Sequence, residues 1–210
     1  MMHPFRFVSL IAVFLAVAGP AIGQSQPSDT ELAAMLRAGG LVIVIRHGAT
    51  NEDQADTDPL HPDNVAEQRR LSAKGEEAAK AFGRALNEIG VPIGKVITSQ
   101  FDRAYQTAKL AGLDQAEKSA DVTEGGLVVS PNENKRRALA LRALVSTEPP
   151  TGTNVVIVTH KPNILDAFGK DWFEVKEGET TIFRPVRPGF QVVTRLQIDE
   201  WPRIAAASKR

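Results

Sequence analysis

The sequence predicts an α/β protein: a three-layer α/β/α sandwich with a mostly parallel central sheet and an antiparallel edge strand. Three observations support this fold class. Short apolar runs that do not alternate with polar residues are typical of strands buried on both faces. Amphipathic stretches with helical spacing separate these runs, as in sheets built from alternating strands and helices. Near the end of the chain, two apolar stretches on either side of "RPG" are typical of a β-hairpin.

The strands are expected where apolar residues are densest. Three buried strands are predicted at "LVIVI" (41–45), "KVITS" (95–99) and "VVIVT" (155–159). The hairpin would pair "TIFRPV" (181–186) with "FQVVTRLQI" (190–198) and supply the antiparallel edge.

Three amphipathic stretches predict helices. The first spans residues 72–90 and ends at Gly90, shortly before a proline. The second runs over residues 101–111. The third begins at Ser130, which is expected to cap it, with Pro131 as its first helical residue. A long polar loop over residues 52–70 is expected to frame the functional site.

Composition narrows the class of protein. The chain has 210 residues, with 25 Lys plus Arg against 25 Asp plus Glu. Because there is no excess of positive charge, nucleic acid is not expected as a partner. The sequence contains no cysteine, which excludes disulfides and thiol chemistry.

The N-terminus resembles a secretory signal. An apolar run follows Arg6, and small residues precede Gln24. We expect residues 1–23 to be a signal peptide cleaved near Gly23 and Gln24. The run is shorter than the roughly 20 residues of a spanning helix, so no stable membrane insertion is expected after cleavage. The mature chain, 24–210, would be a single domain in the periplasm or secreted, with residues 24–30 as a flexible leader.

Polar groups follow each of the three buried strands. Ligands of open α/β sheets gather at the carboxyl ends of parallel strands, so these groups are expected to converge. Two histidines and two arginines repel one another unless an anion binds, and phosphoryl oxygens fit the forks of two guanidiniums. The converging residues are Arg46 and His47, then Ser99, Gln100 and Arg103, and finally Thr159 and His160.

Three blocks of sequence carry a family resemblance. "VIRHGAT", "ITSQFDRAYQTA" and "VIVTHKPN" resemble the signature blocks of the histidine phosphatase superfamily, which includes the phosphoglycerate mutases and many phosphatases. The likeness runs over residues 41–196. The stretches "LAAMLRAGGLVIVIRHGAT", "DAFG" and "EGETTIFRP" are also similar to a secreted bacterial branch, some of whose members act on lipopolysaccharide core heptose phosphate.

The resemblance implies a phosphomonoester hydrolase that needs no metal and no cofactor. His47 would be the nucleophile and would carry the phosphoryl group, while Arg46, Arg103 and His160 would hold its oxygens. The implied substrate is a phosphorylated small molecule or glycan. Further contacts to substrate are expected from Gly48, Thr50, Asn51, Gln100 and Lys161, the last adding a cation at the rim.

Two glutamates are candidates for the acid that protonates the leaving group. Glu133 has the S-x-x-E spacing of a capping box with Ser130, which gives it a structural role. Glu124 has no such role, and we favour it; a site without any acid is the third possibility. The alternative function is a phosphate-binding or phosphosugar-binding module of the same fold without catalysis. A metal site formed by His47, His61 and His160 is a weaker alternative, because the histidines lack the close spacing of metal ligands.

Overall fold

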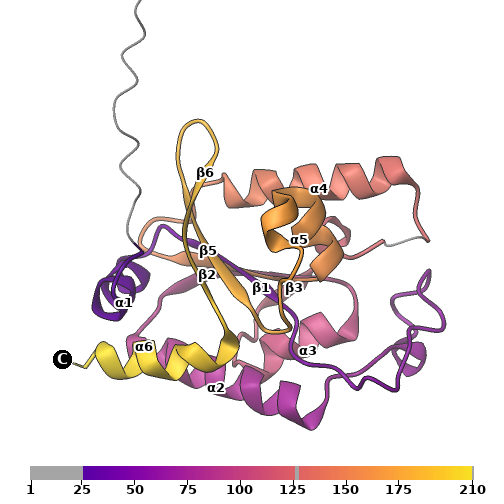
Figure 1. Cartoon of the computed structure of the whole chain (residues 1–210), viewed down its shortest axis with the longest axis horizontal. Helices are drawn as coiled ribbons and strands as arrows, with labels where there is room; N and C mark the ends of the chain where they lie inside the picture. Colours follow the sequence, from indigo (N-terminus) through magenta and orange to yellow (C-terminus); the bar gives the residue numbers. More distant parts are fainter. Residues whose placement is uncertain (1–25, 126–127, 210) are drawn as a thin grey trace, which may run out of the picture.

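The computed structural model describes residues 26–125 and 128–209. The expected signal peptide at residues 1–23 lies outside the described residues, and the domain boundary at residue 24 therefore stays a prediction. In the described part, helices cover both faces of a six-stranded sheet (Figure 1). None of the helices in this part is both long and apolar enough to cross a bilayer.

The sheet confirms the predicted fold class. Its strand order is β3-β2-β4-β1-β5-β6, in which β1 to β4 are mutually parallel. Strand β5 runs antiparallel to both β1 and β6, so the antiparallel pairing lies at one edge of the sheet. The strands are β1 (Val42–Arg46), β2 (Ile93–Thr98), β3 (Ala116–Lys118), β4 (Asn154–Thr159), β5 (Thr180–Pro185) and β6 (Phe190–Leu196).

Helices form a layer on each side of this sheet. The side chains of Ile43 and Ile45 pack with α1, α2, α3 and α6 on one face. Those of Val42 and Val44 pack with α4 and α5 on the other. Each fully buried aliphatic side chain contributes about 1.5–3 kcal/mol to folding. The helices are α1 (Asp29–Ala38), α2 (Ala73–Ile89), α3 (Asp102–Leu110), α4 (Pro131–Val145), α5 (Lys161–Phe168) and α6 (Trp201–Ala207).

The expected helix boundaries are close to the observed ones. Ser72 caps α2, which ends at Gly90 in a left-handed conformation with φ 78°. Ser130 caps α4, and Pro131 is its first residue. The capping box expected there is only half formed. The Ser130 hydroxyl accepts from the Glu133 N–H, but the Glu133 carboxylate pairs with arginines of its own helix.

The expectation of a flexible leader over residues 24–30 is wrong for its second half. Ser28 caps α1, and Asp29 and Thr30 are already helical. The Ser28 hydroxyl accepts a hydrogen bond from the Glu31 N–H, and the Glu31 carboxylate accepts one from the Ser28 N–H in return. The short elements β3, α5 and α6 were also not expected from the sequence. Residues 24 and 25 lie outside the described part.

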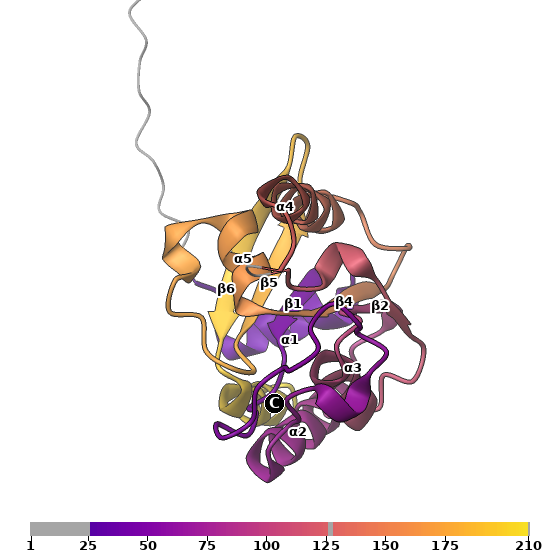
Figure 2. The same ribbon diagram turned by 90° about the vertical axis from the view of Figure 1, so that its right-hand side faces the viewer.

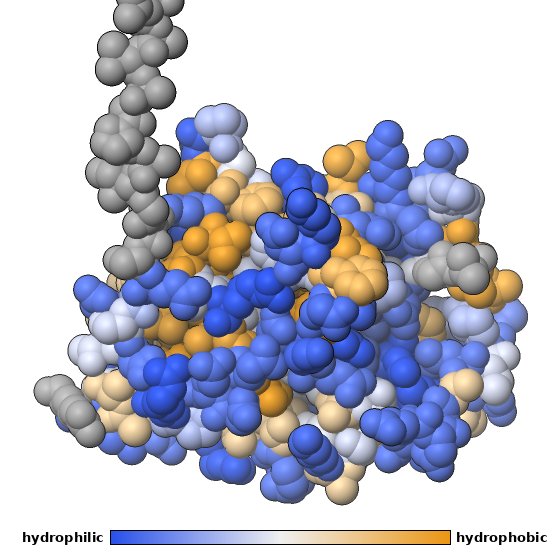
Figure 3. Space-filling view, viewed as in Figure 1, coloured by the Kyte–Doolittle hydropathy of each residue, from blue (hydrophilic) through white to orange (hydrophobic). Residues whose placement is uncertain are grey.

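The fold brings the predicted strand ends together. Strands β1 and β4 pair in register, with Arg46 opposite Thr159, and β2 pairs with the other side of β4. Their carboxyl ends therefore meet at one edge, and the long loop after β1 crosses in front of them (Figure 2). Strands β5 and β6 form a hairpin beside β1, and hydrophobic side chains gather over this hairpin (Figure 3).

Candidate active site

His47 follows β1 directly and is 2% exposed. Its ring nitrogen Nδ1 lies 2.8 Å from the carbonyl oxygen of Gly48, to which the neutral ring donates. The tautomer that makes this bond has its lone pair on Nε2. Burial lowers the pKa of His47 well below its ordinary value, and the neighbouring His160 and Arg103 lower it further. The Nε2 atom is thus available as a nucleophile.

His160 stands at the end of β4, where it is the N-cap residue of α5, and is completely buried. Its ring centroid lies 5.1 Å from that of His47. Burial lowers the pKa of His160 well below its ordinary value, followed by the charges of Arg103, Arg69 and Arg46. The ring is therefore neutral and donates from one nitrogen only.

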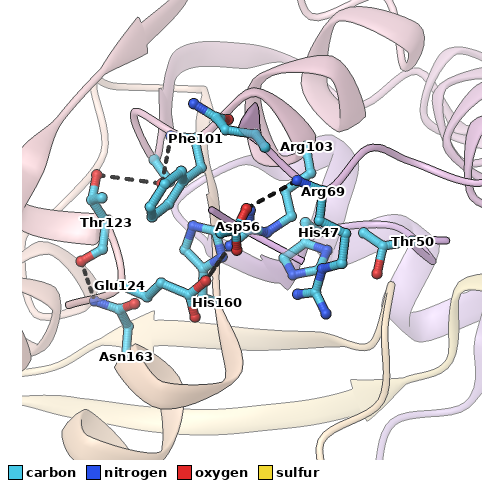
Figure 4. A network of polar contacts seen from close by, with 12 residues as sticks. His47, Thr50, Asp56, Arg69, Phe101, Arg103, Thr123, Glu124, His160 and Asn163 are labelled. Carbon is cyan, nitrogen blue, oxygen red and sulfur yellow. Dashed lines mark hydrogen bonds and ion pairs between the residues drawn. The ribbon is translucent and has the colours of Figure 1, made fainter. Parts of the chain in front are cut away.

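Arg103 lies in the first turn of α3 and is completely buried. Its Nη1 donates to Asp56 Oδ1 at 2.9 Å, and its Nη2 pairs with Glu124 (Figure 4). The guanidinium also lies over the ring of Phe101, 4.6 Å from the ring centroid. Both terminal nitrogens are thus bonded to carboxylates of the protein, and the orientation of the guanidinium is fixed.

Arg46 is anchored by the loop before β5. Its Nη1 donates to the carbonyl of Val175 at 2.9 Å, and its Nη2 lies 3.5 Å from Glu177 Oε1. The Thr50 hydroxyl donates to the same Glu177 oxygen. The predicted substrate residue Thr50 is therefore bonded to the carboxylate that holds Arg46.

Several buried nitrogens in this cluster lack a partner. Within residues 26–125 and 128–209, no hydrogen-bond acceptor is found for the Nε atoms of Arg46, Arg69 and Arg103, nor a partner for either ring nitrogen of His160. Unsatisfied buried donors of this kind are costly, at about 1–3 kcal/mol each or more. A ligand with several negatively charged oxygens would accept hydrogen bonds from these arginine nitrogens and from the one ring nitrogen of His160 that carries a hydrogen. The site is therefore built to bind an oxyanion next to His47.

The two candidate acids have different surroundings. One oxygen of Glu124 contacts Arg103 and lies 3.6 Å from His160 Nδ1, which places it within the cluster. Glu133 lies on α4 and pairs with Arg136 and Arg137, whose hydrogen bonds lower its pKa to about 2. A carboxyl that stays ionised in this way cannot donate a proton near neutral pH. Of the two glutamates, Glu124 is the one within the cluster, and its role as the acid stays a prediction.

Most of the remaining residues predicted to contact substrate bond or pack against other parts of the protein. The Gly48 N–H donates to the Thr107 hydroxyl, and a Cβ at Gly48 would come within 3.1 Å of a carbonyl of α2. Gly48 thus permits close packing of α2, whereas we expected close approach of a phosphate. Asn51 donates weakly to the Leu71 carbonyl, and the Gln100 N–H bonds Thr123. Lys161 Nζ lies 5.0 Å from the centroid of the Phe173 ring.

Loops supply three further members of the site, and sequence reasoning missed two of them, Asp56 and Glu177. Asp56 and Arg69 come from the loop over residues 52–70, and the Asp56 carboxylate also accepts from the Arg69 N–H. Glu177 comes from the loop before β5. Nothing in the spacing of Asp56 and Glu177 distinguishes them from solvated loop charges. His61 is exposed and pairs with Asp58. Within the described residues, no group of three or more His, Asp and Glu has the arrangement of a metal site.

The fold and the site together define an α/β protein with a cluster of arginines and histidines at the carboxyl ends of β1, β2 and β4. Residues 42–125, less than half of the chain, match the family model described as the histidine phosphatase superfamily (branch 1). Over these residues the chain is similar to that superfamily.

Curated relatives match over a short segment. The mitochondrial serine/threonine-protein phosphatase Pgam5 of Drosophila persimilis is 39% identical over 69 residues, which are 33% of this chain and 21% of that protein. The Pgam5 of Drosophila willistoni is 38% identical over the same length and the same shares. The chain thus spans about one fifth of the length of these relatives.

Solved structures match over most of the fold. The protein histidine phosphatase SixA complexed with tungstate has a TM-score of 0.53 and 20% identity, and the match covers 76% of this chain and 98% of that one. A mycobacterial glucosyl-3-phosphoglycerate phosphatase has a TM-score of 0.51 and 17% identity, covering 73% and 97%. At these identities the likeness concerns the fold.

Proposed function

We propose that this chain is a metal-independent phosphomonoester hydrolase that forms a phosphohistidine on His47. The observation that carries the proposal is the set of unpartnered buried nitrogens on Arg46, Arg69, Arg103 and His160 around a neutral His47. Three cations and a donor ring surround one nucleophile, which suits a phosphoryl group with three charged oxygens.

In the first step, the lone pair of His47 Nε2 attacks phosphorus and forms an N–P bond. The P–O bond to the leaving group breaks in line, and the departing oxygen takes a proton from Glu124. The arginines and His160 bind the non-bridging oxygens, where negative charge is concentrated in the transition state. The bond from His47 Nδ1 to the Gly48 carbonyl holds the ring in the reactive tautomer.

In the second step, water attacks the phosphohistidine. Glu124, now ionised, accepts a proton from this water, and the N–P bond breaks to release inorganic phosphate. His47 returns to its neutral form and Glu124 to its protonated form, so the cycle is balanced in protons and needs no cofactor.

The substrate we propose is a phosphorylated small molecule or glycan. The resemblance of residues 32–50, 166–169 and 177–185 to the secreted bacterial branch supports this class. The Pgam5 relatives carry the name of a protein phosphatase, which makes phosphopeptides the competing class. A phosphate-release screen over sugar phosphates, lipopolysaccharide fragments, nucleotides and phosphopeptides decides between them.

Activity in a strong chelator tests the reaction. Nitrophenyl phosphate should be hydrolysed at an unchanged rate when metal ions are removed, because arginines supply the positive charge. His47→Ala should abolish turnover, and Arg46→Ala or Arg103→Ala should reduce kcat on the order of 100-fold, as for loss of an oxyanion donor. Activity that is lost with chelator and restored by zinc would contradict the proposal. Tight binding of phosphate esters without turnover would instead support the non-catalytic module.

The leaving group tests the role of Glu124. A nitrophenolate leaves readily without a proton, whereas a sugar alkoxide does not. Glu124→Gln keeps the shape of the side chain but removes the proton, so it should slow hydrolysis of a sugar phosphate about 100-fold to 10,000-fold and that of nitrophenyl phosphate far less. Glu133→Gln is the comparison and should show much less of this dependence. Equal losses on both substrates in Glu124→Gln would remove the acid role.

We further propose that the protein is exported and that residues 1–23 are removed. The charged start, apolar run and small residues before Gln24 support this. Mass spectrometry of the N-terminus from a bacterial envelope fraction should find Gln24 first. An intact Met1 on cytoplasmic material would contradict it.

A further inference from the structure

Glu124 lies in a segment without regular structure, between the short 3-10 helix Ala120–Val122 and α4. An acid must reach the leaving oxygen within hydrogen-bond distance, and a displacement of about 1 Å can cost 100-fold in rate. The backbone around Glu124 must therefore be held by side chains.

Thr123 directly precedes Glu124 and is 4% exposed, and hydrogen bonds of its side chain hold it in place. Its hydroxyl donates to the Ser119 carbonyl at 2.7 Å and accepts from the Gln100 N–H at 2.9 Å. These two bonds tie the segment to the ends of β2 and β3, close to Arg103. Neither bond involves the backbone carbonyl of Thr123, which belongs to the peptide bond between Thr123 and Glu124.

That carbonyl accepts two hydrogen bonds from helices on the same face of the sheet. Arg137 of α4 donates from Nη1 at 2.9 Å, and Asn163 of α5 donates from Nδ2 at 3.1 Å (Figure 4 draws the Asn163 bond). The Arg137 side chain is 12% exposed and its Nε is bonded to Glu133 at 2.8 Å. The guanidinium is therefore fixed at both ends, between Glu133 and the Thr123 carbonyl.

The chain after Glu124 is also packed against α4 and the segment before it. A Cβ at Gly125 would lie 2.1 Å from a methyl carbon of Val129 and 2.5 Å from Asn134 Oδ1. Glu124 is thus flanked on both sides by fixed backbone. Its carboxylate pairs with Arg103 and lies 3.6 Å from His160 Nδ1, and the backbone anchors limit any shift toward these groups.

We infer that Arg137 is a positioning residue for the acid: its ion pair with Glu133 and its bond to the Thr123 carbonyl hold Glu124 where it reaches the leaving oxygen. This inference rests on the proposed function, in which Glu124 is the acid. It also gives Glu133 a part in the mechanism, as the anchor of Arg137.

The test compares two neighbouring arginines of α4. Arg137→Met keeps the aliphatic stem and removes all donors. Arg136→Met is the matched control, because Arg136 also pairs with Glu133 but bonds Asp121 and not Thr123, and is 49% exposed. The readout is the ratio of kcat for glycerol phosphate, a poor leaving group, to kcat for nitrophenyl phosphate. A merely structural loss lowers both rates and leaves this ratio unchanged.

Arg137→Met should lower the ratio about 10-fold, since part of the acid catalysis is lost, and Arg136→Met should leave it at the wild-type value. In a Glu124→Gln background, Arg137→Met should not change the ratio further. The glutamine side chain in Arg137→Gln is too short to reach both Glu133 and Thr123, so this variant should behave like Arg137→Met. It replaces Arg137→Met as the test if the methionine variant does not fold.

An unchanged ratio in folded Arg137→Met or Arg137→Gln would overturn the inference, as would an equal fall in Arg136→Met. If Glu124→Gln changes the ratio while Arg137 variants do not, only the positioning role fails. If Glu124→Gln leaves the ratio unchanged, the acid role fails and the inference fails with it.

Discussion

At the scale of single residues, the state of His47 decides whether the site reacts. The ring is buried beside cations, which lowers its pKa well below the ordinary 6.5. A histidine with a lowered pKa stays neutral, and therefore nucleophilic, as the pH falls through 6.5 and gains its proton only at a lower pH. The His47 signal, identified by its loss in His47→Gln, should show no protonation in an NMR titration from pH 8 to 6. A midpoint at or above pH 6.5 would contradict this electrostatic account.

The sequence predicted the residues that follow buried strands. Arg46 ends β1, His47 and His160 directly follow β1 and β4, and Arg103 lies in the first turn of the helix after β2, so a strand pattern places them at one edge. The supporting carboxylates Asp56 and Glu177 lie in loops whose path depends on tertiary contacts, and no local pattern encodes that path. For the same reason, the partners of Gly48 and Thr50 were not foreseen.

At the scale of elements, α1 begins with a capping signal in the sequence that was not used to predict the helix. Ser28 and Glu31 have the same S-x-x-E spacing that was recognised at Ser130, and here the box closes in both directions. The segment was instead interpreted as the end of a flexible leader that begins the mature chain. Strand β3 and helix α6 are short, with three and seven residues. A hydrophobic pattern must extend over more than one or two helical turns or strand repeats before it can be distinguished from chance. Elements as short as these are stabilised by packing on the sheet.

The cap of α1 can be tested directly. Ser28→Ala removes the acceptor for the Glu31 N–H and should reduce the free energy of unfolding by about 1 kcal/mol. In a domain of this size that corresponds to about 2–4 °C in Tm, measured by thermal unfolding followed by circular dichroism. Ser28→Thr keeps the hydroxyl and is the control, with a much smaller change. An unchanged Tm in Ser28→Ala would show that α1 is held by its apolar face alone.

At the scale of the whole molecule, the strand order assembles the site. Strand β1 pairs with β4 rather than with the next strand in sequence, and β4 lies between β1 and β2. This order puts residues 46, 103 and 160 beside one another although they are far apart in the chain. The alternation of strands and helices predicted the layers and the parallel sheet, but the order comes from long-range pairing, which a hydrophobic pattern does not specify.

The central claim is a covalent bond between phosphorus and His47, and trapping that bond tests it most directly. Enzyme mixed briefly with nitrophenyl phosphate labelled in its phosphoryl group, then quenched in alkali, should carry the label on the peptide that contains His47. The label should be stable in alkali and lost in acid, as a phosphohistidine is, and should be absent from His47→Ala. Label on another residue during turnover would contradict the account. So would turnover without any labelled enzyme under conditions where hydrolysis of the phosphorylated enzyme is rate-limiting.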